Sequence, residues 1–215
     1  GLPRFSGGLV GFLAYDVVRS FERLPEDTTD DLDQPGLYLM LADTLVAFDN
    51  VAQSMKVVAH AWLEEGADLR AEDEAACARV DDVIARLAQP LPSAPPPPAE
   101  GAPVITSNYQ QHAYEGAVER AKEYIRAGDV NQVVLAQRVQ CALRARAFEN
   151  YRCLRTLNPS PYMFFLRTGD RVVLGASPEV MARLDGREIT VRPIAGTRPR
   201  GTSELEDRDL EQELV

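Results

Sequence analysis

The stretch GASPEVMARLDGREITVRPIAGTRPRG, residues 175–201, carries the most distinctive local pattern of the chain. An apolar run ends in Ser177-Pro178-Glu179, which places a carboxylate directly after a proline. The pair Asp185-Gly186 predicts a hairpin turn, because these two residues tolerate positive φ at both central positions. The second strand leads into residues 193–198, where a glycine admits close backbone approach and a threonine and an arginine offer hydrogen-bond donors. These features are typical of an anion site, although an ordinary strand exit has the same composition.

Residues 104–215 are predicted to alternate helices and strands around this stretch. The elements expected before it are a helix with N-cap residues at 106–108 that ends at Gly128, a buried strand at 129–139, a helix at 146–157, and a hairpin turned at Gly169-Asp170. After it, Ser203 and Glu206 form a capping-box pattern that opens a helix. That helix meets no stop signal before Val215, so we expect it to continue past this residue.

Residues 1–89 are predicted to form a strand-rich N-terminal part. The elements expected there are a strand at 5–15 whose glycines admit a close neighbour, a short helix at 16–21, a hairpin of residues 36–48 and 54–63, and a helix at 67–87. Residues 90–103, PLPSAPPPPAEGAP, predict an extended polyproline II linker, which we favour over a ligand for an SH3-type domain. All three parts are expected to belong to one intertwined domain.

Composition limits the classes of function that this chain can have. With 215 residues, 45% of them hydrophobic, the chain can bury a core of one large or two small domains. The formal net charge of −10 disfavours nonspecific binding to nucleic acid or to an anionic membrane. A local cluster of Arg192, Arg198 and Arg200 therefore stands out as a potential site for a small anion.

The cysteines and histidines predict neither disulfides nor a zinc site. Three cysteines without CxxC spacing and two isolated histidines, His60 and His112, lack the required patterns. The sequence also contains no apolar run of the roughly 18 residues that a membrane span needs and no pattern of a signal peptide. A reducing cytoplasm is the expected compartment.

Four motifs together resemble the chorismate-utilising enzymes, and within them the large subunits of anthranilate synthases. GASPE followed by PIAGTRPRG is the most specific pair, because the two motifs flank a hairpin of the right length. The other motifs are the glycine-rich opening at residues 5–25, the run AGDVNQVVLAQR at 127–138, and NPSPYMFF at 158–165. The resemblance implies an α+β fold with long, mostly antiparallel sheets and flanking helices, of which this chain would hold an incomplete part.

The resemblance also implies roles for individual residues. Gly196 and Thr197 would hold a carboxylate of chorismate, and Glu179 would be the general acid that protonates the departing hydroxyl. That role requires a protonated carboxyl, which burial could arrange. A structural alternative is that Glu179 complements the N-terminus of a short helix. Gln132 occupies the position of a lysine in relatives that add water, which favours ammonia as the nucleophile. Ala195 stands where aminodeoxychorismate synthases carry a nucleophilic lysine.

Effector, metal and partners follow from the same resemblance. Pro161, Tyr162 and Met163 would contact the inhibitor tryptophan, and a glutamine amidotransferase subunit would deliver the ammonia. The Mg²⁺ ligands are expected beyond Val215, so no metal residue is assigned in this chain and we expect it to be inactive alone. The alternatives that remain open are an aminodeoxychorismate synthase of the folate pathway and a non-catalytic module that binds tryptophan or chorismate.

Overall fold

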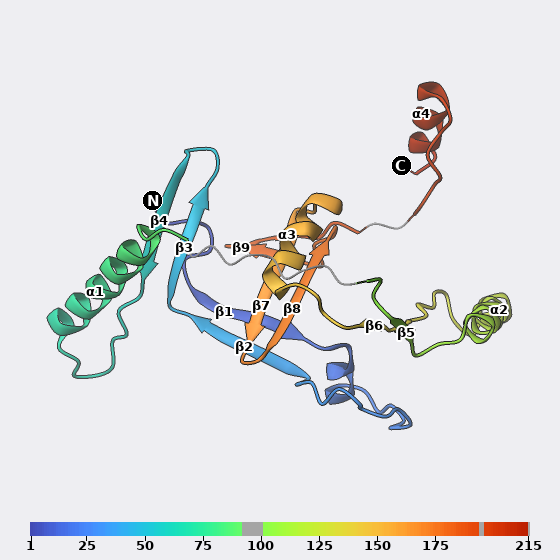
Figure 1. The fold of residues 1–215 in the computed structure, drawn as a ribbon, viewed down its shortest axis with the longest axis horizontal. Coiled ribbons are helices and arrows are strands. Elements are labelled where there is room, and N and C mark those ends of the chain that lie inside the picture. The colour runs from blue at the N-terminus through green and yellow to red at the C-terminus, as the bar shows by residue number, and fades with distance from the viewer. Residues whose placement is uncertain (92–100, 194–195, 215) are drawn as a thin grey trace. The chain divides into compact units, whose positions relative to one another are not determined.

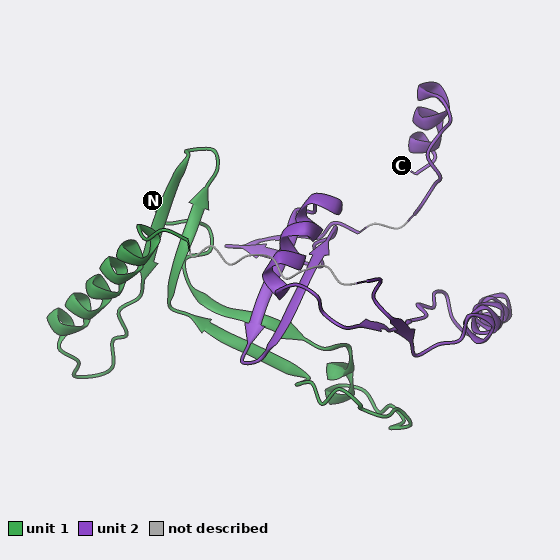
Figure 2. Ribbon diagram, viewed as in Figure 1, with its two compact units in different colours: residues 1–94 green, residues 95–215 purple. Residues whose placement is uncertain are grey.

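The computed structural model describes residues 1–91, 101–193 and 196–214 (Figure 1). The chain divides into two compact units, residues 1–94 and 95–215 (Figure 2). The boundary falls inside the predicted linker, most of which lies outside the described residues. The polyproline conformation and the intertwined single domain stay predictions.

The first unit contains strands, one long helix and a 3₁₀ turn. Its elements are β1 (Gly8–Leu13), the 3₁₀ helix η1 (Tyr15–Ser20), β2 (Leu37–Ala42), β3 (Thr44–Asp49), β4 (Ser54–Ala59) and α1 (Leu69–Leu87). β1 pairs with β2 and β3 with β4, both antiparallel, and α1 packs against β4. The predicted strand at 5–15 and the short helix after it are both confirmed.

Gly11 explains why the first strand is rich in glycine. A Cβ atom at this position would lie 1.8 Å from the carbonyl oxygen of Tyr38 on the neighbouring strand β2. No side chain fits there, because backbone atoms cannot move aside as the end of a flexible side chain can. The close neighbour predicted from the sequence is therefore β2.

The predicted hairpin of residues 36–48 and 54–63 is partly wrong. The first run breaks at Asp43 into β2 and β3, and these two strands pair with different partners. Asp43 makes its own contacts at the break, since its carbonyl oxygen accepts from the His60 amide at 2.9 Å and its carboxylate from the Trp62 indole at 3.3 Å. The indole bond lowers the pKa of Asp43 below its usual value. Only the β3–β4 half of the predicted hairpin is confirmed.

Helix α1 confirms the prediction for residues 67–87. The carboxylate of Asp68 caps its start by accepting from the amide of Arg70 at 3.0 Å. One face then packs on β4 around the buried Ala76. The cap satisfies one of the amide groups that the first helical turn leaves without a partner.

The second unit combines three helices with three antiparallel hairpins or strand pairs in the residues described. Its elements are β5 (Ile105–Ser107), α2 (Gln111–Ala127), β6 (Val139–Cys141), α3 (Ala147–Leu157), β7 (Tyr162–Thr168), β8 (Arg171–Ser177), β9 (Arg183–Asp185), β10 (Glu188–Thr190) and α4 (Glu204–Gln212). β5 pairs with β6, β7 with β8, and β9 with β10. The mixed α+β class and the antiparallel pairing are as predicted.

The start of α2 differs from the prediction. Residues 106 and 107 belong to β5, and the side-chain oxygen of Asn108 accepts from the Arg138 amide at 2.7 Å instead of capping the helix. The helix begins three residues later, after Gln110, which makes no side-chain cap. Its end is confirmed, because Gly128 adopts the left-handed conformation with φ 84°.

The buried strand predicted at 129–139 is wrong. Residues 132–138 form no strand, and β6 covers only the last residue of the predicted range. A strand needs a neighbour for its backbone groups, and in the described part of the chain this run has one only where β6 meets β5. Its apolar residues are consequently open to solvent, with Val134 82% exposed.

The turn between β9 and β10 corrects a detail of the prediction. Asp185 is the last residue of β9 and pairs with Glu188, so the two loop residues are Gly186 and Arg187. Only Gly186 has positive φ, at 62°. Glycine at the first loop position is what a type II′ turn requires, and aspartate is not needed there.

Buried side chains are few. Among the residues that the structure describes, only Ala76 and Ala117 are buried. All sheets in these ranges have two strands. The described residues therefore present much of their apolar surface to solvent.

Candidate active site

The β7–β8 hairpin is the scaffold on which the predicted site residues lie. Its seven paired positions run from Tyr162 opposite Ser177 to Thr168 opposite Arg171, and Gly169 makes the turn with φ 67°. Opposite Phe164 lies Gly175, the first residue of GASPE. A Cβ atom on Gly175 would come within 2.6 Å of the Phe164 ring, so the glycine makes room for the aromatic side chain.

Three aromatic rings attach α3 to this hairpin. Phe165 on β7 contacts Phe148 edge-on at 5.4 Å between ring centroids and Tyr151 at 5.6 Å. The helix packs on both strands of the hairpin (Figure 1). Such ring pairs prefer tilted or edge-on geometry, and here they fix the helix on the scaffold that carries the site.

Glu179 lies two residues beyond β8, in a segment held by serine hydroxyls. The Ser160 hydroxyl donates to the carbonyl oxygen of Ser177, and it accepts from the Tyr162 amide at 3.2 Å. The Ser177 hydroxyl in turn donates to the carbonyl oxygen of Glu179 at 3.1 Å. These two serines position the backbone at Glu179. The sequence analysis had missed this role, since it named Ser160 only within the motif NPSPYMFF.

The surroundings of Glu179 differ from both expectations for it. Its side chain is exposed, whereas a buried carboxyl was expected for a general acid. The structural alternative is also wrong, because residues 180–182 are not helical and β9 begins at Arg183. No helix N-terminus therefore follows the carboxylate.

Gly196 and Thr197 begin the segment that leads into α4, and both are exposed. Ala195, at the position where aminodeoxychorismate synthases carry a nucleophilic lysine, lies outside the described residues. Two arginines of the predicted basic cluster are engaged with carboxylates of the α4 region. The guanidinium group of Arg198 lies 3.0 Å from the carboxylate of Glu213, and that of Arg200 lies 2.6 Å from the carboxylate of Asp207.

The start of α4 confirms most of the predicted capping box. The Ser203 hydroxyl accepts from the Glu206 amide at 3.3 Å. The Glu206 carboxylate bonds one residue earlier than the pattern predicts, to the hydroxyl and amide of Thr202. Those bonds, the hydroxyl first, lower the pKa of Glu206 below its usual value. Gly201 allows the chain to pass close to the start of α4, since a Cβ atom at this position would lie 2.3 Å from the Asp207 amide nitrogen.

The other predicted site residues lie apart from this segment in the chain. Gln132 is exposed in the run that forms no strand. Pro161, Tyr162 and Met163 lie at the start of β7, with Tyr162 39% exposed and Met163 half-buried. Because Tyr162 pairs with Ser177, the predicted tryptophan-binding residues adjoin the end of β8 that leads to Glu179.

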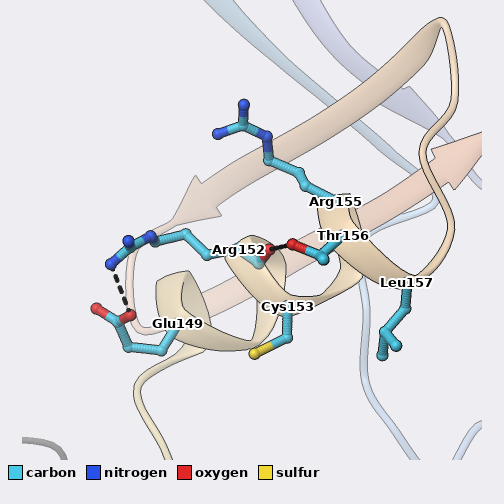
Figure 3. Close-up of a pocket in the computed structure, with 6 residues that line it drawn as sticks. All are labelled: Glu149, Arg152, Cys153, Arg155, Thr156 and Leu157. Carbon is cyan, nitrogen blue, oxygen red and sulfur yellow. Dashed lines mark hydrogen bonds and ion pairs between the residues drawn. The ribbon is translucent and has the colours of Figure 1, made fainter.

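A surface cavity of about 750 Å³ does not coincide with any predicted site residue. It lies along α3 and is lined by Glu149, Arg152, Cys153, Arg155, Thr156 and Leu157 (Figure 3). Within this lining, the guanidinium group of Arg152 donates a hydrogen bond to the carboxylate of Glu149 at 3.1 Å. The lining comes from one helix, so the cavity has no opposing wall to enclose a substrate.

Two further properties concern the described residues alone. Within them, no three His, Cys, Asp or Glu side chains are placed to hold a metal ion. None of the described helices combines the length and the apolarity needed to cross a membrane.

The scaffold, the GASPE exit and the glycine-threonine segment can be compared with known proteins. The profile of the chorismate binding enzymes matches residues 2–215, and the chain belongs to this family. Its sequence is 44% identical over 214 residues to the anthranilate synthase component 1 of Thermus thermophilus, covering 100% of this chain and 44% of the relative. The anthranilate synthase component 1 of Saccharomyces cerevisiae is 37% identical over 219 residues, covering 100% of this chain and 43% of the relative.

A solved structure shows the same fold. The crystal structure of anthranilate synthase component I from Streptococcus pneumoniae superposes with a TM-score of 0.80 at 29% identity, covering 99% of this chain and 46% of that one. The chain thus spans less than half the length of the relatives that it matches. The family and fold predicted from the four motifs are confirmed.

Proposed function

We propose that this chain is part of the large subunit of an anthranilate synthase, which converts chorismate and ammonia to anthranilate, pyruvate and water. The observation that carries the proposal is the 44% identity along the whole chain to a relative with that name. The β7–β8 scaffold supports it, because the hydroxyls of Ser160 and Ser177 hold the backbone that carries Glu179.

In this proposal the residues of the chain bind and protonate the substrate. The Gly196 amide and the Thr197 hydroxyl donate to a carboxylate of chorismate. Glu179 gives a proton to the ring hydroxyl, so that the C–O bond breaks and water leaves. Ammonia adds to the ring near Gln132, and loss of pyruvate restores the aromatic ring. Glu179 is exposed in this chain, so its side chain is open to a substrate.

Mg²⁺ is part of the proposal for the complete enzyme only. The described residues of this chain do not fit a Mg²⁺ site, since they bring no three candidate ligands together. No step is assigned to the ion here.

A glutamine amidotransferase as ammonia donor and tryptophan as inhibitor complete the proposal. The supporting feature for tryptophan is that Tyr162 at the start of β7 pairs with Ser177 at the end of β8. A ligand on Pro161, Tyr162 and Met163 would thus touch the strand pair that positions Glu179.

The test is the identity of the product formed by the complete subunit that contains this sequence. With chorismate, Mg²⁺ and ammonium, we expect fluorescent anthranilate and stoichiometric pyruvate. Accumulation of aminodeoxychorismate without pyruvate would assign the chain to the folate pathway instead. The 215-residue chain under the same conditions is expected to form no product, and it serves as the matched control.

A further inference from the structure

Residues 196–202, called the Gly-Thr segment, lie along α4 from its first turn to its C-cap. Arg200 pairs with Asp207 in the first turn, and Arg198 pairs with Glu213, the C-cap residue. A surface cavity of about 450 Å³ is lined by residues of both the segment and the helix, which places the two side by side. The helix therefore supports the segment that is expected to bind a carboxylate of chorismate.

The junction between the segment and the helix is fixed by the Asp207 side chain. One carboxylate oxygen accepts from the Gly201 amide at 2.8 Å, and the other lies 2.6 Å from the Arg200 guanidinium group. The side chain of Asp207 is only 29% exposed, so both contacts are partly shielded from water. A single carboxylate thus sets the direction in which the segment leaves the helix.

Arg198 connects the other end of the helix to the backbone of Thr197. Its guanidinium group donates to the Thr197 carbonyl oxygen at 3.2 Å and to the Glu213 carboxylate at 3.0 Å. Nearby, a Cβ atom on Gly196 would lie 3.0 Å from the Leu214 side chain. The peptide group that follows the proposed substrate-binding hydroxyl is therefore held in place by an arginine that is itself held by α4.

This arrangement gives the two arginines a different role from the one predicted from the sequence. Arg198 and Arg200 were expected to belong to a cluster that binds a small anion, but each is engaged with a carboxylate. Residues 204–214 contain six carboxylates and one arginine. So much negative charge repels a substrate that carries two carboxylates, and it attracts the arginines of the segment.

We propose that Asp207 and Glu213 are positioning residues for the chorismate carboxylate. Through Arg200, the Gly201 amide and Arg198 they hold the Gly-Thr segment in the conformation in which its amide and hydroxyl donate to the substrate. Neither side chain touches chorismate. The inference rests on the proposed function, since that function assigns the carboxylate to Gly196 and Thr197. Donors that are held in place bind an anion more tightly, because less ordering is needed on binding.

The test is the kinetics of the complete subunit that contains this sequence. Glu213→Ala should raise the KM for chorismate about 2- to 5-fold, the range expected when an exposed ion pair is lost. Asp207→Ala should raise it about 5- to 10-fold, because the bond to the Gly201 amide is lost as well. In both variants kcat should stay nearly unchanged, since a carboxylate held equally in the ground state and the transition state affects KM alone.

Two kinds of variant serve as controls. Glu213→Gln and Asp207→Asn keep an oxygen that can accept the same hydrogen bonds, and they should show smaller increases in KM. Glu204→Ala removes the same charge from α4, but Glu204 pairs with Arg208 inside the helix at 2.7 Å. Its KM for chorismate should equal that of the unsubstituted subunit.

A second measurement does not require turnover. Amide hydrogen exchange of residues 196–202 in the complete subunit reports how firmly the segment is held. Exchange there should become about 2- to 10-fold faster in Glu213→Ala and Asp207→Ala, and it should not change in Glu204→Ala.

Three outcomes would overturn the proposal. A lower KM in either alanine variant would mean that the released arginine binds the substrate directly. An unchanged KM with faster exchange would mean that the segment is held without any consequence for binding. Unchanged exchange would mean that α4 does not hold the segment. A product other than anthranilate from the unsubstituted subunit would contradict the proposed function alone, because aminodeoxychorismate is also formed from chorismate and the ratios of KM would still test the positioning.

Discussion

Replacement of Gly175 by alanine is expected to weaken the β7–β8 hairpin through a single contact. The new Cβ atom would lie 2.6 Å from Cζ of Phe164, closer than carbon atoms can approach, so the ring must leave its place over the strand. Overpacking of a closed core costs about 1–3 kcal/mol, and the cost here lies near the lower end because Phe164 is 38% exposed and its ring is the end of a side chain that can move. Alanine is favoured over glycine inside a strand by roughly 0.5–1 kcal/mol, which leaves a net loss of at most about 0.5 kcal/mol.

The assay is amide hydrogen exchange of the hairpin, which measures local opening free energies. The expected loss corresponds to opening constants that rise by at most about 2-fold at β7 and β8. In a Phe164→Ala background the ring is gone, so Gly175→Ala should be neutral or stabilising by up to about 1 kcal/mol. The coupling between the two substitutions is therefore expected to be about 1 kcal/mol.

The control is Gly116→Ala in α2, where no atom lies within 4 Å of the new Cβ. That change should stabilise the helix by about 1 kcal/mol. If Gly175→Ala costs the same with and without the Phe164 ring, the ring contact is not the reason for the glycine, and the structural explanation of GASPE is refuted.

Three further predictions concern hydrogen bonds. Ser160→Ala removes the hydrogen bonds to the Ser177 carbonyl and the Tyr162 amide, so the free energy of local opening at the start of β7, measured by hydrogen exchange, should fall by about 1–2 kcal/mol. Ser160→Thr should retain most of this protection. The pKa of Glu206 is lowered, so this carboxylate stabilises α4 above the ordinary pKa of glutamate, and α4 helicity followed by NMR should fall as the pH drops through the lower folded pKa. The fall should be smaller in Glu206→Gln, where only the other carboxylates of the α4 region titrate. Asp68→Ala removes the N-cap of α1 and should cost about 1 kcal/mol in urea unfolding, while an unchanged midpoint would show that the cap is not stabilising.

Patterns that are local in sequence predicted the corresponding structure well. The stripe of α1, the glycine that ends α2 and the serine that caps α4 each depend on residues within one or two helical turns. The hairpin at Gly169 is of the same kind. Four motifs also predicted the family, since each of them is recognised within a short run of residues.

Features that depend on distant partners were predicted less well. The run around Gln132 has the composition of a buried strand, but strand formation requires a neighbour that the described residues do not provide. The break at Asp43 depends on contacts with His60 and Trp62, which no window of sequence contains. The exposure of Glu179 belongs to the same group, because burial of a side chain depends on residues that are distant in the sequence.

The kinetics of a Glu179→Gln variant of the complete subunit test the central functional claim most directly. Glutamine keeps the size of the side chain and the backbone bond from Ser177, but it cannot donate the proton that the leaving hydroxyl requires. The expected result is a fall in kcat for anthranilate formation of about 10²- to 10⁴-fold with the KM for chorismate nearly unchanged. A kcat close to that of the unsubstituted enzyme would contradict the assignment of Glu179 as the general acid.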